Sequence, residues 1–181
     1  MGAGKSAALL LVAHNYDCIG QQSKTYTSAL DDRFGESVVA SRMGISRVAH
    51  AFNRDTVFDL DTVGEGIRCV LVDEAQFLTT TQVVQLHRLA ALHGVPVICF
   101  GLRTDFRGVA FEGSAALGVI ADQIEELKSV CTCGKKASFN VRFDADGNRV
   151  KDGAQIQIGG NATYQQACAA CFYGDSLKRQ T

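Results

Sequence analysis

The sequence predicts an α/β protein with a parallel β-sheet at its core and a small β-rich module at its C-terminal end. Residues 67–73 and 95–101 are short β-branched runs of the kind that form buried parallel strands. A helical pattern at residues 79–94 lies between them, so strand, helix and strand make one βαβ unit. After residue 130 the pattern changes to short alternating segments with turn residues, which predicts the separate module.

Length and composition fit this architecture. The chain has 181 residues, 46 % hydrophobic and 20 % charged, which suits one folded domain with an appendage and excludes a disordered or fibrous protein. The formal net charge of -1 gives no reason to expect nucleic acid or an anionic membrane as partner. No apolar run approaches the roughly 20 residues of a membrane span. We expect a core at residues 1–130, a module at residues 131–181 and a small-molecule ligand.

Two helices of the core are predicted by composition and end signals. Residues 4–20 are rich in alanine and leucine and favour a first helix. Residues 79–94 carry apolar side chains at helical spacing, with Thr79 as a candidate N-cap and Gly94 as the stop. In the module, residues 137–143 and 155–158 alternate as strands do, and a turn is expected at residues 146–147.

The start of the first helix has the features of a phosphate-binding loop. Gly4, Lys5 and Ser6 match the end of the P-loop pattern, in which backbone N–H groups surround phosphates, the lysine contacts them and the hydroxyl binds Mg²⁺. The opening glycine of the full pattern, and the strand that feeds the loop, would fall before Met1. We therefore expect the first strand of the sheet to be missing from this chain. The tripeptide alone also occurs by chance.

The strand at residues 67–73 strengthens the phosphate-site interpretation. It ends in Asp73, which Glu74 follows, and the carboxyl ends of parallel strands are where ligands bind in open α/β sheets. One carboxylate there can bind the Mg²⁺ of a P-loop enzyme, and its neighbour can act as a base. The alternative is that both acids are ordinary solvated residues at the end of a strand.

The cysteines predict a metal site in the module. Cys131 with Cys133, and Cys168 with Cys171, form two close pairs separated by a stretch with hairpin signals. Four thiolates brought together by turns bind Zn²⁺ tetrahedrally and leave no position for water, so the site would be structural. A redox pair or idle thiols are the alternatives. Cys18, Cys69 and Cys99 stand among apolar residues and are expected in the core. Seven cysteines without an export signal favour reduced thiols and a cytoplasmic location.

These motifs occur together in an order that resembles the type II thymidine kinases, a zinc-containing cytosolic family. The matching segments are residues 4–6, 31–33, 73–77, 101–106 and 158–164 together with the four cysteines. The spacing of the first cysteine pair is similar to that of the enterobacterial-type branch. The resemblance covers essentially the whole chain, and it implies a P-loop (RecA-like) parallel sheet core with a small zinc-anchored, β-rich lasso module.

The resemblance also implies an activity and a set of site residues. The family transfers the γ-phosphoryl group of ATP to the 5′-hydroxyl of thymidine, giving dTMP, and Glu74 matches its catalytic base. The residues implied for ATP, phosphate and Mg²⁺ are Gly2, Ala3, Gly4, Lys5, Ser6, Asp31, Arg33 and Asp73. Those implied for thymidine are Phe77, Leu102, Phe106, Ile156, Gln157, Ile158, Gly159, Gly160 and Tyr164. The family also implies structural Zn²⁺ on the four cysteines and a homotetramer.

Two other functions are compatible with parts of the sequence. One is another P-loop ATPase, although a single nucleoside-sized lid with no long coupling region argues against it. The other is a zinc-ribbon module that binds nucleic acid. Between Cys131 and Cys171 there are five basic and three acidic residues and no aromatic ladder for base stacking, which favours an ordinary solvated face.

Overall fold

The computed structural model describes residues 4–30, 38–156, 164–174 and 177. These fall into two compact units. The first, which we call the sheet unit, comprises Gly4–Leu102 and Glu112–Ile124. The second, the β module, comprises the described parts of Arg103–Phe111 and Glu125–Thr181. The second unit is thus assembled from two separate stretches of the chain, and the domain boundary at residue 130 stays a prediction.

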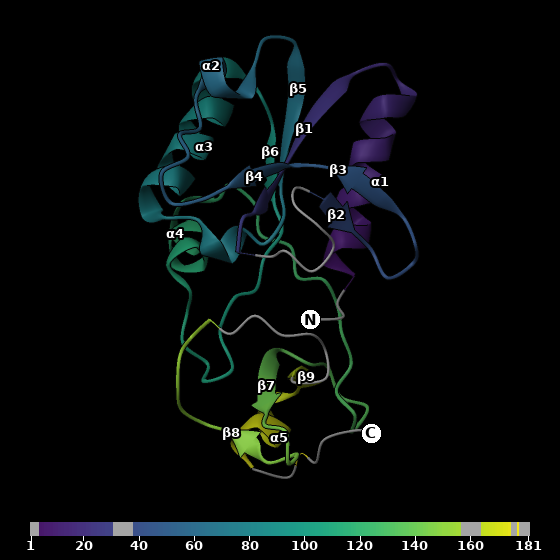
Figure 1. Ribbon diagram of the computed structural model, residues 1–181, viewed down its shortest axis with the longest axis vertical. Coiled ribbons are helices and arrows are strands. Elements are labelled where there is room, and N and C mark those ends of the chain that lie inside the picture. Colours follow the sequence, from purple (N-terminus) through teal and green to yellow (C-terminus); the bar gives the residue numbers. More distant parts are fainter. Residues whose placement is uncertain (1–3, 31–37, 157–163, 175–176, 178–181) are drawn as a thin grey trace. The chain divides into compact units, whose positions relative to one another are not determined.

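The sheet unit is built on four parallel strands in the order β4-β1-β5-β6 (Figure 1). Their bounds are Gln22–Ser28 for β1, His50–Phe52 for β4, Ile67–Val72 for β5 and Val97–Cys99 for β6. Helix α3, Thr80–His93, connects β5 to β6. The predicted α/β class, its parallel sheet and its βαβ unit are confirmed.

Helices cover the sheet on both faces (Figure 1). Helix α1, Lys5–Cys18, lies on one face, and α3 and α4, Glu112–Ile120, lie on the other. Thr79 and Gln82 form a capping box at the start of α3, and Gly94 ends it with a left-handed φ of 64°. The shorter elements of this unit are β2 Val38–Ala40, β3 Ser46–Val48, α2 Leu60–Val63 and the 3₁₀ turn η1 Ala75–Phe77.

Each face of the sheet has its own apolar core. The larger cluster includes Phe52, Phe58, Val70 and Leu86 and packs under α3. The smaller one joins Leu9 and Ala13 of α1 to Cys69 and Leu71 of β5. Cys69 is buried as predicted, and Cys99 is partly buried. Cys18, which was expected in the core, is exposed. The expectation was wrong because α1 buries the face that carries Leu9, Leu10 and Ala13, and Cys18 lies at its end, where its Sγ is 3.4 Å from His14 Nε2.

Strand β1 lies between β4 and β5 although no hydrophobic pattern predicts it. Its sequence is largely polar, yet Thr25, Tyr26, Thr27 and Ser28 are all buried. The strand is stabilised by parallel pairing on both sides, with Tyr26 opposite His50 in β4 and Val72 in β5. Backbone pairing to two neighbours thus compensates for low apolar content.

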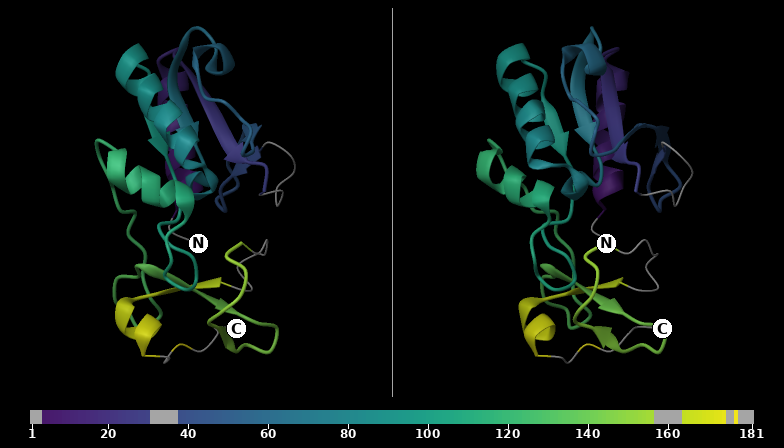
Figure 2. Two further views of the ribbon diagram at one scale, coloured as in Figure 1. Left: turned by 90° about the vertical axis from the view of Figure 1, so that its left-hand side faces the viewer. Right: turned by 60° about the vertical axis from the view of Figure 1, so that its left-hand side comes forward.

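The β module contains a three-stranded antiparallel sheet in the order β8-β7-β9 (Figure 2). The bounds are Phe139–Phe143 for β7, Arg149–Val150 for β8, Tyr164–Ala167 for β9 and Ala169–Tyr173 for helix α5. The strand and turn predicted at residues 137–147 are confirmed. The strand predicted at residues 155–158 is not seen at Gln155 and Ile156, because β8 supplies the hairpin partner of β7; residues 157–158 lie outside the described part. Among the described helices, none combines the length and apolar character needed to cross a bilayer.

Candidate functional site

The helix that follows the phosphate motif begins at the motif itself. Gly4 is the N-cap of α1 and has a left-handed φ of 74°, a conformation that glycine adopts without strain. Lys5 and Ser6 form the first turn of the helix, where free backbone N–H groups and the helix dipole favour anions. Gly2 and Ala3, also predicted to contact phosphate, lie outside the described residues.

Asp73 lies directly after β5 and faces the phosphate motif. The Ser6 hydroxyl donates a 2.9 Å hydrogen bond to Asp73 Oδ2, across 67 positions of the sequence. Asp73 as a whole is only 4 % exposed. Burial, together with the charge of Glu74, raises the pKa of Asp73 above its usual range, although Lys5 and the Ser6 hydrogen bond oppose the shift. A hydroxyl and a carboxylate held this close to a helix N-terminus are suitable oxygen ligands for Mg²⁺.

Glu74 has a strained backbone conformation. Among the described non-glycine residues it is the only one with positive φ, at 52°. Left-handed geometry disfavours side chains with a Cβ, so it persists only where the surroundings enforce it. The backbone on either side is fixed: Asp73 N–H donates to the Tyr26 carbonyl at 2.8 Å, and Ala75 N–H donates to the Phe100 carbonyl at 2.9 Å.

A buried amide holds the carboxylate of Glu74. Gln76 Nε2 donates a 2.5 Å hydrogen bond to Glu74 Oε2, and Gln76 Oε1 accepts one of 3.0 Å from the Leu102 N–H. Gln76 is only 2 % exposed. One side chain therefore links the acid after β5 to the segment after β6. The sequence analysis assigned Gln76 no role, although it lies inside the matching segment at residues 73–77, two residues after Glu74.

Two glycines allow this packing. A Cβ on Gly101 would lie 3.0 Å from the Gln76 backbone nitrogen and 3.1 Å from its Oε1. A Cβ on Gly113, in α4, would lie 2.6 Å from the Ala75 carbonyl oxygen and 2.7 Å from that of Leu78. The turn that carries Gln76 is thus in close contact with the backbone of both neighbouring segments.

The structure brings Lys5, Ser6, Asp73 and Glu74 to one edge of the sheet unit, where the N-terminus of α1 lies beside two acids. Phe77 and Leu102 are partly buried in the same unit, and Phe77 packs against its larger core. Asp31 and Arg33, predicted to contact metal and phosphate, lie outside the described residues.

The remaining residues predicted to bind the nucleoside belong to the β module. Phe106 is buried at 2 % exposure in a loop organised by Asp105, whose Oδ1 accepts 2.9 Å hydrogen bonds from the N–H groups of Arg107 and Val109. Ile156 is 44 % exposed, and Tyr164 begins β9. Gln157, Ile158, Gly159 and Gly160 are not among the described residues.

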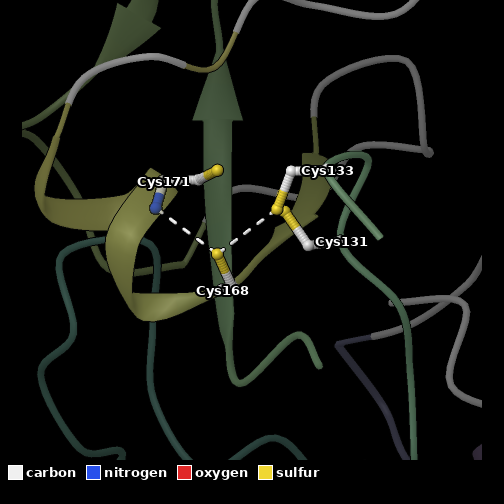
Figure 3. Close-up of side chains that lie close together, drawn as sticks. All are labelled: Cys131, Cys133, Cys168 and Cys171. Atoms are coloured by element: carbon white, nitrogen blue, oxygen red, sulfur yellow. Dashed lines mark hydrogen bonds between the residues drawn. The ribbon is translucent and has the colours of Figure 1, made fainter. Parts of the chain in front are cut away.

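The four predicted cysteines of the β module converge (Figure 3). Their Sγ atoms all lie within 4.8 Å of one another, and those of Cys133 and Cys168 are 3.6 Å apart. Ligands at about 2.3 Å from a tetrahedral zinc ion would be about 3.8 Å from each other. The cluster therefore has the donor atoms and spacing of a site that could hold a metal ion.

The electrostatics of the cluster favour thiolates. Burial raises the pKa of Cys131, but hydrogen bonds from the backbone of Cys133 and Cys168 and from neighbouring thiols outweigh it and lower the pKa to about 6. The backbone N–H of Cys171 lowers the pKa of Cys168 in the same way. Thiolates are the form that binds metal.

Comparison with known proteins shows the family to which the chain belongs. The family model described as thymidine kinase matches residues 1–172. A thymidine kinase of Albidiferax ferrireducens is 53 % identical over 99 % of this chain and 91 % of its own length. Thymidine kinases of Chromobacterium violaceum and Salmonella choleraesuis are 49 % and 46 % identical over 97 % and 98 % of this chain and 95 % and 88 % of their own lengths. The chain belongs to the thymidine kinase family.

Proposed function

We propose that this protein transfers the γ-phosphoryl group of ATP to the 5′-hydroxyl of thymidine, producing dTMP and ADP in nucleotide salvage. Family membership supports the substrate pair. The observation that carries the proposal is the hydrogen bond between Ser6 and Asp73 beside Glu74, since it joins the phosphate-binding helix end to two acids.

Glu74 is the proposed general base. As the 5′-oxygen of thymidine forms its bond to the γ-phosphorus, the hydroxyl proton passes to the Glu74 carboxylate, and the bond from phosphorus to the β–γ bridging oxygen breaks to release ADP. Gln76 holds one oxygen of that carboxylate at 2.5 Å and so fixes its orientation. A positioned base of this kind contributes about 10²–10⁴-fold to the rate.

The phosphates of ATP are proposed to bind at the start of α1. Lys5 would contact the β- and γ-phosphates, with the backbone of Gly2, Ala3 and Gly4 around them, and Ser6 and Asp73 would hold Mg²⁺ directly or through water. Asp31 and Arg33 are the further residues expected near metal and phosphate. Mg²⁺, when bound, neutralises charge on the phosphate oxygens.

The thymine site and the metal are also proposed on family grounds. Thymidine would contact Phe77, Leu102 and Phe106, with the segment from Ile156 to Gly160 and Tyr164 completing the site. The four cysteines would hold one Zn²⁺, and four protein thiolates leave no open position for catalysis. The zinc would therefore stabilise the module. A cytoplasmic homotetramer is the expected assembly.

A nucleoside panel tests the proposal. Purified protein is incubated with ATP, Mg²⁺ and each of thymidine, deoxyuridine, deoxycytidine and deoxyadenosine, and monophosphate formation is measured. We expect thymidine to be phosphorylated and the last two to give no product. ATP hydrolysis that is independent of any nucleoside would instead indicate another P-loop ATPase, and it would overturn the proposal.

A further inference from the structure

The geometry points to Arg142 as a positioning residue for nucleoside binding: it joins Phe106 to the segment that leads to Ile156. The inference rests on the proposed function, because Phe106 and Ile156 are two of the residues proposed to bind thymidine. Arg142 lies outside every motif that carries the resemblance, and no reaction step involves it.

Arg142 contacts two separate parts of the β module. It extends from β7 and is only 5 % exposed. Its Cζ lies 3.7 Å from the centroid of the Phe106 ring, so the guanidinium covers one face of that ring. Its Nη1 donates to the Ala154 carbonyl at 3.0 Å, and its Nη2 donates to the Asp152 carbonyl at 3.4 Å. One side chain thus connects the loop of Phe106 to residues 152–154.

The position of Arg142 in the sheet extends these connections. In the antiparallel register Arg142 is opposite Val150 in β8 and opposite Tyr164 in β9. Gly153 has a φ of 122°, and a Cβ there would lie 3.0 Å from Arg142 Nη2. A larger residue at position 153 would therefore need a strained backbone and a shift of the guanidinium.

Charge pairing does not explain why this arginine is buried. Among the ion pairs of the described residues none includes Arg142, whereas Arg107, in the same loop as Phe106, pairs with Asp105 at 2.9 Å. A buried guanidinium without a carboxylate is costly, so its aromatic and carbonyl contacts are what hold it there. Lysine cannot reproduce them, because it lacks the planar group that stacks and donates two directed hydrogen bonds at once.

The test compares Arg142→Met and Arg142→Lys with the wild type in steady-state kinetics. We expect both to raise the KM for thymidine, by about tenfold for Arg142→Met, while the KM for ATP stays within about twofold. The kcat at saturating thymidine should stay within about threefold, because no reacting atom contacts Arg142. Zinc content is measured for each variant, and Arg142→Lys carries the comparison if Arg142→Met loses its metal.

Arg149→Lys is the matched control. Arg149 lies in β8, stacks on Phe172 with its Cζ 4.7 Å from the ring centroid, and donates to the Phe172 carbonyl, so it makes similar contacts away from Phe106. We expect its KM for thymidine to be unchanged. An equal rise of the KM for thymidine in Arg142→Lys and Arg149→Lys would show general destabilisation of the module and overturn the inference.

The outcomes separate this inference from the proposed function. A wild type that phosphorylates thymidine, together with Arg142 variants of unchanged KM for thymidine, would overturn the inference alone. A wild type that neither binds nor phosphorylates thymidine would overturn both. A rise confined to the KM for thymidine in the Arg142 variants would support both.

Discussion

The sheet unit and the β module bury different kinds of side chain. In the sheet unit, buried apolar side chains cover both faces of the four parallel strands. Phe52, Phe58 and Leu86 belong to the larger of its two apolar clusters. The core of the β module is smaller, and two of its eight buried members are the cysteines Cys131 and Cys168. A core of that size gives little stability, and small domains of this kind depend on metals or disulfides. Hydrophobic burial thus stabilises the first region, and we expect metal binding to stabilise the second.

The same difference explains where strain can be tolerated. The sheet unit contains a buried Asp73 and a left-handed Glu74, both of which cost folding free energy. Its extensive apolar core offsets that cost. In the β module, by contrast, two buried charged groups are compensated locally: Arg142 by an aromatic ring and two carbonyls, and Asp105 by Arg107.

Removal of the metal should produce the largest difference in stability between the β module and the sheet unit. A chelator, or Cys168→Ser, should abolish amide-exchange protection in Phe139–Phe143 and Tyr164–Ala167, because the cluster loses the ion that neutralises its thiolates. Protection in Gln22–Ser28 and Ile67–Val72, and binding of Mg·ATP, should persist. Hydrogen exchange by mass spectrometry with calorimetric ATP binding measures both. Loss of protection in the two regions together would contradict separate stabilisation.

Gly113→Ala should damage the sheet unit through packing alone. The new Cβ would lie 2.6 Å from the Ala75 carbonyl oxygen, so α4 or η1 must shift, at a cost of about 1–3 kcal/mol in unfolding free energy. Gly118→Ala, in the same helix, is the control, since a Cβ there meets nothing within 4 Å. It should stabilise the protein by about 0.5–1 kcal/mol. Urea unfolding with equal effects for both variants would argue against the close approach.

Gln76→Met should lower kcat about tenfold without changing ATP affinity, because it keeps the volume of the side chain but releases Glu74 Oε2 and the Leu102 N–H. Gln82→Met is the control. Gln82 is equally buried, and its Nε2 donates to the carbonyls of Asn53 and Thr56 at 2.7 and 2.8 Å, far from the acids in sequence. It should lose stability and keep its kcat per folded molecule. An unchanged kcat in Gln76→Met, with a lowered kcat in Gln82→Met, would contradict the positioning role of Gln76.

The smallest expected effect concerns the stability of the sheet unit against pH. Because burial raises the pKa of Asp73, the protonated carboxyl favours folding and its ionisation opposes folding. The stabilisation from the protonated form is therefore lost as pH rises from the ordinary aspartate pKa to the raised one. Asp73→Asn should therefore leave Tm at pH 7 unchanged or raise it by no more than about 4 °C.

Asp59→Ala is expected to change Tm at pH 7 in the opposite direction from Asp73→Asn. The Thr62 backbone N–H lowers the pKa of Asp59, so this carboxylate stabilises the fold above its ordinary pKa, and the stabilisation is lost as pH falls through the lowered one. Its Tm at pH 7 should decrease. Thermal melts from pH 3 to pH 8 compare the two variants with the wild type, and a decrease for Asp73→Asn would contradict the burial argument.

Local signals were sufficient to predict much of the fold. The apolar β5 and β6, the capped α3 and the alanine-rich α1 each carry their own pattern, and the spacing of the four cysteines predicts their convergence. Strand β1 was missed because its stabilisation comes from pairing with two neighbours rather than from apolar side chains. Cys18 was misplaced because it was grouped with the apolar residues of α1, whereas it follows Asp17 at the end of that helix and lies away from the face that carries Leu9, Leu10 and Ala13.

The details of the site depend on contacts between distant segments. Asp73 and Glu74 were predicted from the end of a strand, but the left-handed φ of Glu74 is imposed by backbone bonds to Tyr26 and Phe100. The role of Gln76 requires the Leu102 N–H, which belongs to another segment. Arg142 acquires its place from strand register and from a loop more than 30 positions earlier. No local pattern encodes these relationships.

Glu74 is the residue proposed to accept the proton of the thymidine 5′-hydroxyl during phosphoryl transfer. The most direct test of this role is single-turnover dTMP formation by Glu74→Gln, with the binding of ATP and thymidine measured on the same preparation. We predict a rate at least about 10²-fold below that of the wild type, with both affinities within about threefold. A rate within about threefold of the wild type, with binding intact, would contradict the claim.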